Sequence, residues 1–302
     1  MKGSASPLSA MNSDFKTGKK LLELCKEYHI SVSQAMLNRE VEYLEKEEQE
    51  VWNRMQHAWL IMQNSAKKAF EGEIRSIGGL IGGEAARIAK RRQEALPSAC
   101  GSMMSKAIAY AMGVLEVNAS MGLIVAAPTA GSSGVIPGAF LAVKEEWNLP
   151  DEAIIKALFN AGAVGYLISY NATVAGAEGG CQAEVGSASA MAASAVTELL
   201  GGTPEQCLSA ASGAMANILG LICDPIGGLV EAPCQQRNAL GVSNALISAE
   251  IALSRIENLV PFDEVVQVMY QVGRSMPQEL RETALGGMAA APSACGRCRK
   301  MI

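Results

Sequence analysis

Three cysteines lie in segments whose composition is typical of ligands to a metal cluster. Cys181 follows two glycines in GGCQAEVGSAS, whereas Cys223 and Cys234 lie beside prolines in LICDPIGGLVEAPCQQRN. An iron–sulfur cluster needs thiolates that project from tight turns, with backbone N–H groups directed at sulfur. Three protein ligands would leave one iron open, and an open iron can act as a Lewis acid.

The spacing of these cysteines does not by itself decide between a cluster and buried thiols. Cys223 follows Cys181 by 42 positions, and Cys234 follows Cys223 by 11. Ferredoxins and zinc fingers have tighter spacing. The flanking prolines and glycines favour a cluster because they mark turns, but three buried thiols without a metal stay open as the alternative.

The other cysteines indicate a reducing compartment. The chain has eight cysteines, and its first residues, MKGSASPLSAMNSDF, contain no hydrophobic signal-peptide core. We therefore expect a cytoplasmic protein with free or metal-bound thiols rather than disulfides. Cys25 and Cys207 lie within predicted helices, and we expect both of them, and Cys100, to be buried structural thiols.

Two polar, glycine-rich segments could bind a carboxylate. The segment APTAGSSGVIPG (127–138) lacks both the Lys-Ser/Thr ending and the preceding strand of a phosphate-binding loop. Its hydroxyl side chains and glycine amides could instead form a cup of hydrogen-bond donors. The hydroxyls are those of Thr129, Ser132 and Ser133. The segment SIGGLIGGEA (76–85) could do the same.

Histidine chemistry is not expected in this chain. It has only two histidines, His29 and His57, and both lie in the charged N-terminal part. A histidine-based triad or a histidine metal site is therefore disfavoured. The side chains left for general acid–base catalysis, none of them distinguished by spacing, are Lys106, Glu116, Glu178, Glu184 and Asp224.

The pattern along the chain predicts a mainly α fold. We find no alternating strands and no βαβ rhythm, and small residues dominate the apolar segments. We predict one large helical domain over 17–292, a flexible leader over 1–16 and a cysteine-containing tail over 293–302. The site would lie on loops rich in Gly, Ser, Pro and Cys, namely 75–84, 127–138, 176–187 and 223–238. Helices are expected at 17–29, 31 to about 70, 87 to about 94, 100–122, 138–147, 151–170, 182–200, 204–220, 243–256, 262–274 and 277–285.

Composition excludes two classes of partner. Hydrophobic residues make up 49% of the chain and aromatic residues 5%, so that the core must be built from small and aliphatic side chains. The formal net charge of −5 argues against nucleic-acid binding, which needs a basic face. The most apolar stretch, 107–127, is interrupted by Glu116 and Asn118, and we predict no membrane span.

Four long motifs together resemble a known family. They are EVNASMGLIVAAPTAGSSGVIPG (116–138), GGCQAEVGSASAMAA (179–193), GGTPEQ (201–206) and LGLICDPIGGLVEAPCQQRNALGVSNAL (219–246). With LRETALGGMAAAP (280–292), they are similar to the catalytic subunit of bacterial iron–sulfur-dependent L-serine dehydratases. The resemblance covers nearly the whole chain from about residue 17.

The resemblance implies a cofactor and a set of site residues. A 4Fe–4S cluster would be held by Cys181, Cys223 and Cys234. The residues that fall in the matched loop are expected to contact the substrate, namely Asn118, Thr129, Ser132 and Ser133. Two further residues just after the third cysteine, Arg237 and Asn238, could pair with the substrate carboxylate.

The resemblance also implies a partner chain. Some family members carry a small regulatory α/β domain in the same chain, and others carry it as a separate β subunit. This sequence has no room for that domain, so we expect the α subunit of a heterodimer or higher oligomer. In single-chain relatives a C-terminal cysteine can bind the open iron in the resting state, and Cys298 or Cys295 could do so here. A mobile tail with exposed thiols and a redox-active pair are the alternatives.

The reaction implied is the conversion of L-serine to pyruvate and ammonia by β-elimination. The general base is not identified by the sequence, and it could come from the partner chain. Two other functions stay open. One is an L-cysteine desulfidase of the same superfamily, and the other is a non-catalytic iron–sulfur sensor with four permanent protein ligands.

Overall fold

The chain folds into packed helices, as the sequence predicts. The computed structural model describes residues 13–94 and 96–294. Within these residues there is no β-strand, and the only β-type pairing is an isolated bridge between Cys223 and Arg281. The prediction of a mainly α fold is confirmed. The α-helices are α1 (Gly18–Tyr28), α2 (Val32–Leu44), α3 (Glu48–Lys68), α4 (Glu84–Gln93), α5 (Gly101–Ala119), α6 (Val135–Trp147), α7 (Asp151–Asn171), α8 (Gly176–Gly179), α9 (Ser187–Leu199), α10 (Pro204–Ala216), α11 (Cys234–Leu253) and α12 (Phe262–Ser275).

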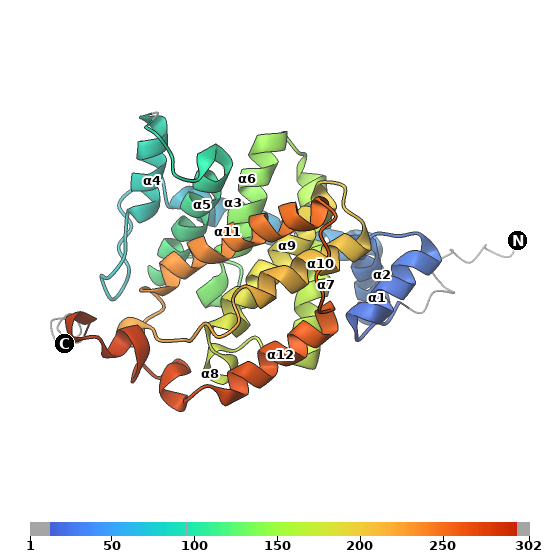
Figure 1. Cartoon of the computed structure of the whole chain (residues 1–302). Coiled ribbons are helices and arrows are strands. Elements are labelled where there is room, and N and C mark those ends of the chain that lie inside the picture. The colour runs from blue at the N-terminus through green and yellow to red at the C-terminus, as the bar shows by residue number, and fades with distance from the viewer. Residues whose placement is uncertain (1–12, 95, 295–302) are drawn as a thin grey trace, which may run out of the picture.

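Helix α9 lies at the centre of the molecule (Figure 1). Its sequence, SASAMAASAVTEL, is mostly Ala and Ser, and nearly every residue is buried. Helices α6, α7, α10 and α11 pack around it. Small side chains let helix axes approach closely, so a core with few aromatic residues can still be densely packed.

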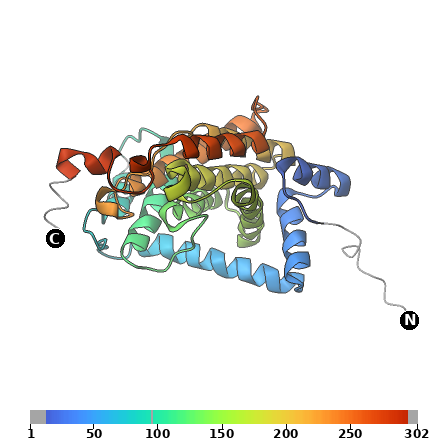
Figure 2. The ribbon, with the colours of Figure 1, turned by 90° about the horizontal axis from the view of Figure 1, so that it is seen from below.

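The N-terminal and C-terminal segments lie at opposite ends of the molecule. Helices α1 and α2 form one end, and the segment after α12 forms the other (Figure 1). Helix α3 runs along one side and packs on α5 and α7 (Figure 2). The folded part begins before residue 17, because Phe15 is 1% exposed and packs edge-to-face on Tyr166. The predicted leader boundary is therefore too late by a few residues.

The predicted helix from Ser31 to about Phe70 is two helices. The Ser31 side chain caps α2 by accepting a hydrogen bond from the Gln34 backbone N–H. The helix stops at Glu45, whose φ is 51°. The run EKEEQE follows, and its residues Glu48 and Glu50 lie in the first turn of α3, where negative charge favours the start of a new helix. The break lets α3 turn and cross α5 and α7.

Two predictions near the C-terminus are wrong. Helix α11 begins at Cys234, nine residues before the expected start at 243. The expected helix over 277–285 is only a short 3-10 helix, Gln278–Leu280, followed by positive φ at Glu282 and Ala284. Beyond this short turn, the segment hydrogen-bonds to Cys223 through the Leu280 carbonyl and the Glu282 N–H. Long-range pairing of this kind leaves no periodic pattern in the sequence.

One helix among the described residues, α7 (Asp151–Asn171), is long and apolar enough to cross a membrane. In the structure 67% of its most apolar window is buried inside the molecule. It packs against α2, α3 and α9. This is the position of a core helix, so α7 gives no reason to abandon the prediction of no membrane span.

Close approach of α5 and α6 makes Gly138 sensitive to substitution. A Cβ at Gly138 would lie 2.8 Å from the Ala107 carbonyl oxygen, whereas a Cβ at Gly162 in α7 would meet no atom closer than 4.0 Å. We expect Gly138→Ala to lower the free energy of unfolding by about 1–3 kcal/mol. Gly162→Ala is the matched control, since it adds the same methyl group to a helix without a clash, and it should be neutral or slightly stabilising. Urea unfolding of both variants measures this, and equal stabilities would contradict the described packing.

Candidate active site

Cys181 lies between a tight turn and a π-helical turn. The short helix α8 ends at Gly179, and Gly180 then has a φ of +75°. A Cβ at Gly180 would lie 2.9 Å from the Leu221 carbonyl oxygen, so that only glycine fits. The π-helical turn Gln182–Gly186 follows and leads into α9. π-Helical turns are frequent at functional sites.

The side chain of Gln182 connects the first cysteine segment to its neighbours. Its amide oxygen accepts a 2.8 Å hydrogen bond from the Gly220 N–H, and its amide nitrogen donates a 2.9 Å bond to the Met269 carbonyl. Its backbone N–H donates to the Leu221 carbonyl at 2.9 Å. These bonds fix the Cys181 segment to residues 220–221, which directly precede Cys223 in the chain by two to three positions, and to α12.

Cys223 is held by the C-terminal segment. Its N–H donates to the Leu280 carbonyl at 2.9 Å, and its carbonyl accepts from the Glu282 N–H at 2.7 Å. The next residue, Asp224, is 1% exposed and accepts a 2.6 Å bond from the Met288 N–H. Residues more than fifty positions later therefore set the position of the second cysteine.

Cys234 is the first residue of α11 and follows Pro233. The Asn238 amide donates to the Cys234 carbonyl at 2.9 Å and to the Gly131 carbonyl at 2.7 Å. Its oxygen accepts from the Gly134 N–H at 3.0 Å. Asn238 therefore joins the third cysteine segment to the predicted carboxylate-binding loop.

The three cysteines lie within electrostatic range of one carboxylate, that of Glu184. Cys181 and Cys223 belong to the same small buried cluster, and the Cys223 thiol lies 3.7 Å from Glu184 Oε2. The charge of Glu184 acts on all three cysteines, including Cys234. Burial is the main reason that the pKa of Cys181 rises to about 12, as does that of Cys234, and it also raises the pKa of Cys223.

The donor set fits an iron–sulfur cluster better than a single ion. No three His, Cys, Asp or Glu side chains in the described part of the chain converge on one ion position. A cluster makes a different demand, because each of its irons takes its own thiolate. Three buried, unpaired thiols from three separate segments match that demand. Gly176 lets the backbone approach both groups closely, since a Cβ there would lie 3.1 Å from Cys223 Sγ and 2.6 Å from Glu184 Oε2.

The predicted loop 127–138 lies against the same carboxylate. Thr129 Oγ1 donates to Glu184 Oε1 at 2.8 Å and lies 3.1 Å from Ser132 Oγ. Ser133 is 1% exposed, and its hydroxyl has no hydrogen-bond partner among the described residues. Asn118 lies at the edge of the loop, where its amide donates to the Ala130 carbonyl at 3.3 Å. Of the four residues that we predicted to contact substrate, the structure thus places Thr129 on Glu184 and Ser132 beside Thr129.

Arg237 and Asn238 have internal partners. Arg237 Nη2 lies 2.6 Å from Asp224 Oδ1, and its Nη1 donates to the Ile222 carbonyl at 2.9 Å. Its charge acts on Cys181 and Cys234, so it lies beside the thiols. Asn238 is fully buried, and both ends of its amide are bonded. Their predicted pairing with a substrate carboxylate stays a prediction.

The second predicted carboxylate cup holds a carboxylate of the chain itself. Segment 76–80 donates to Glu231, which is 3% exposed, through the Ser76 hydroxyl and the amides of Gly78 and Leu80. Sequence reasoning did not single out Glu231 because nothing in its neighbourhood shows which loop it meets. Its position three residues before Cys234 was the available signal.

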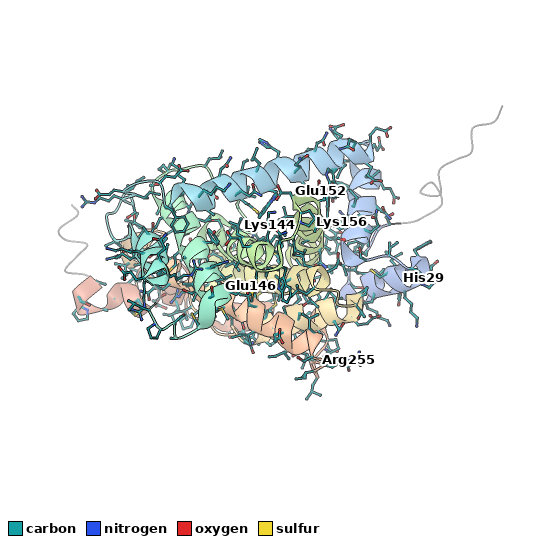
Figure 3. All side chains as sticks on the ribbon, turned by 90° about the horizontal axis from the view of Figure 1, so that it is seen from above. His29, Lys144, Glu146, Glu152, Lys156 and Arg255 are labelled. Carbon is teal, nitrogen blue, oxygen red and sulfur yellow. The ribbon has the colours of Figure 1, made fainter. Side chains whose placement is uncertain are left out.

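Other predicted residues lie apart from the thiols or outside the described part. His29 ends α1 at the N-terminal end of the molecule, far from the C-terminal segment that holds Cys223 (Figure 3). Cys25 and Cys207 are buried within α1 and α10, as expected, but Cys100 is exposed. Cys100 precedes the first turn of α5, where no neighbouring element covers it. Cys295 and Cys298 lie outside the described residues.

Comparison with known proteins supports the resemblance. The serine dehydratase alpha chain pattern matches residues 27–289. The chain belongs to the serine dehydratase alpha chain family. A probable L-serine dehydratase alpha chain of Bacillus subtilis is 46% identical over 92% of this chain and 92% of its own length. The L-serine dehydratase alpha chain of Peptoniphilus asaccharolyticus is also 46% identical, over 90% of this chain and 93% of its own length.

Some relatives are longer, and this chain matches only part of their length. An L-serine dehydratase of Streptomyces coelicolor is 39% identical over 91% of this chain, and the match covers 60% of that protein. The rest of that protein lies outside the match. Family membership therefore covers proteins of two lengths, and this chain matches the shorter kind nearly end to end.

The burial of the thiols predicts their reactivity. In the native chain without metal, we expect iodoacetamide at pH 8 to modify Cys100 at least about tenfold faster than Cys25 or Cys207. Burial raises the pKa of Cys25 to about 12, which keeps it protonated, and it also raises that of Cys207. Peptide mapping by mass spectrometry over time measures the rates, and denaturant should make the three cysteines equivalent. Equal rates in the native chain would contradict the described burial.

Proposed function

We propose that this chain is the catalytic subunit of an enzyme that converts L-serine to pyruvate and ammonia. Cys181, Cys223 and Cys234 would hold a 4Fe–4S cluster. The observation that carries the proposal is that all three cysteines lie within electrostatic range of Glu184, with the Cys223 thiol 3.7 Å from it, in a member of this family. The proposed substrate follows from the relatives, several of which are named L-serine dehydratases.

When bound, the cluster would supply Lewis-acid chemistry that assists departure of the substrate hydroxyl. The chain supplies the setting. The three thiols and Asp224 are almost fully buried, so water is largely excluded. The hydroxyl of Ser133 has no hydrogen-bond partner among the described residues and could orient a substrate carboxylate, whereas the hydroxyl of Thr129 is already bonded to Glu184.

Glu184 is our candidate for proton transfer. The α-proton of serine is a poor acid, so β-elimination needs a positioned base. Oε1 of Glu184 is fixed by Thr129, while Oε2 lies beside the Cys223 thiol and packs on the backbone of Gly176. Neither histidine of the chain competes for this role, since His29 and His57 are both exposed on the N-terminal helices.

Replacing Glu184 tests this role. We expect Glu184→Gln to lower kcat by about a hundredfold or more, because the amide cannot accept the proton. Glu178→Gln is the matched control, since Glu178 is an exposed carboxylate of the same segment and should leave kcat unchanged. Iron content is measured in parallel, so that loss of the cluster is separated from loss of the base. A Glu184→Gln variant with full iron and wild-type kcat would exclude Glu184 as the base.

We also propose a separate β chain as partner and the cytoplasm as location. The alpha chain names of the relatives imply a second chain, and the longer single-chain relatives extend well beyond the region matched here. The second chain would supply that remaining part, giving a heterodimer or a higher oligomer.

The cluster is tested by anaerobic purification with the β chain. We expect iron and sulfide in the complex, activity that is lost in air, and recovery with ferrous iron and thiol under argon. Cys181→Ser, Cys223→Ser and Cys234→Ser should each abolish activity and lower iron content. Cys100→Ser, which removes an exposed and remote thiol, is the control and should change neither.

The same preparation separates the competing functions. Pyruvate formed from L-cysteine but not from L-serine would identify a desulfidase. A reduced cluster whose electron paramagnetic resonance spectrum ignores L-serine, without pyruvate formation, would identify a sensor. Full activity after chelation in air would exclude the cluster altogether.

A further inference from the structure

The carboxylate of Glu231 is fully enclosed by donors from a single loop. Oε1 accepts a 2.7 Å bond from the Gly78 N–H, and Oε2 accepts bonds from the Leu80 N–H at 2.9 Å and the Ser76 hydroxyl at 2.6 Å. Charge-assisted bonds of this kind are stronger than neutral ones, particularly when buried. The loop therefore binds a carboxylate as its composition predicts, and the ligand is a side chain of the same protein.

The close approach of this loop depends on glycine. A Cβ at Gly78 would lie 2.8 Å from Glu231 Oε1 and 2.2 Å from a side-chain carbon of Leu229. The Ser76 N–H also donates to the Ile81 carbonyl at 3.1 Å, which closes the loop on itself. The loop is thus shaped around the segment that leads into α11, and it is not a free surface turn.

A second contact ties the other end of the loop to the same segment. Gln235 Nε2 donates to Glu116 Oε1 at 2.8 Å and to Glu84 Oε2 at 3.3 Å. Glu84 begins α4 directly after the loop, and Glu116 belongs to the neighbouring helix α5. The backbone N–H of Gln235 donates to the Glu231 carbonyl at 2.9 Å, which starts the hydrogen bonding of α11.

Cys234 lies between these two ties. Glu231 is anchored three residues before it and Gln235 one residue after it, both to the chain segment 76–84. Neither contact involves a thiol, and neither is part of the predicted substrate loop. The arrangement fixes the backbone on both sides of the third cysteine.

We propose that Glu231 is a positioning residue that holds Cys234 in place for the site. This inference rests on the proposed function only in taking Cys234 as a cluster ligand. The positional role itself can be measured in the chain without metal.

The test compares thiol accessibility in Glu231→Gln and wild type. Loss of the anchored carboxylate should raise the rate of Cys234 modification by iodoacetamide about tenfold in the metal-free chain, because local opening becomes easier. The rate at Cys181, which belongs to another segment, should change by less than about twofold. Glu231→Asp keeps the charge but shortens the side chain, and it should fall between the two. Glu205→Gln, an exposed carboxylate on α10, is the control and should change no rate.

Three outcomes separate the possibilities. Faster modification of Cys234 alone supports the positioning role. Unchanged rates, or equal increases at Cys234 and Cys181, overturn it, since general destabilisation would expose both thiols. If Glu231→Gln fails to fold, Ser76→Ala removes one of the three donors and provides the same comparison with a milder change.

The anaerobic complex gives an independent reading. If the wild type binds a cluster, Glu231→Gln at equal folded fraction should retain several-fold less iron and show an altered spectrum of the reduced cluster. If the wild type binds no cluster, the proposed function fails, while the alkylation result still decides the role of Glu231.

Discussion

The site depends on how one buried amide, that of Gln182, is satisfied. Gln182 is 1% exposed, and its side chain bonds to the Gly220 N–H and the Met269 carbonyl. An unsatisfied buried amide costs about 1–3 kcal/mol, so these contacts are strongly selected once the core forms. They bring together the Cys181 turn, the approach to Cys223 and helix α12. These contacts help to fix the positions of Cys181 and Cys223 relative to each other.

Small residues make these contacts geometrically accessible. A Cβ at Gly273 in α12 would lie 2.6 Å from the Gly179 Cα and 3.2 Å from the Gln182 side-chain nitrogen. Helix α12 can therefore lie directly on the turn that carries Cys181. Small side chains likewise let α9 lie at the centre of the molecule. Small residues therefore shape the site as well as the core, in a chain with 5% aromatic residues.

Much of the polar character of the site segments serves the protein itself. Asp224 pairs with Arg237, Asn238 bridges two loops, and Glu231 occupies an amide cup. Asp224, Asn238 and Glu231 are nearly fully buried, and each needs a partner. The polar residues near the predicted site are therefore of two kinds. Some hold the loops, and others, such as Ser133, have a hydroxyl with no hydrogen-bond partner among the described residues.

The sequence alone determined the helical class, the family and the segments that carry the three cysteines, because these follow from local composition and long motifs. It also placed the helix starts near Ser31 and at Pro204 correctly, since the Ser31 and Thr203 caps depend on neighbouring residues. Only the tertiary structure decided that α11 begins at Cys234, that the segment after α12 pairs with Cys223, and that Glu231 fills the 76–80 loop. These contacts join residues tens to more than a hundred positions apart, and no local pattern encodes which distant donor a buried carboxylate or carbonyl will meet.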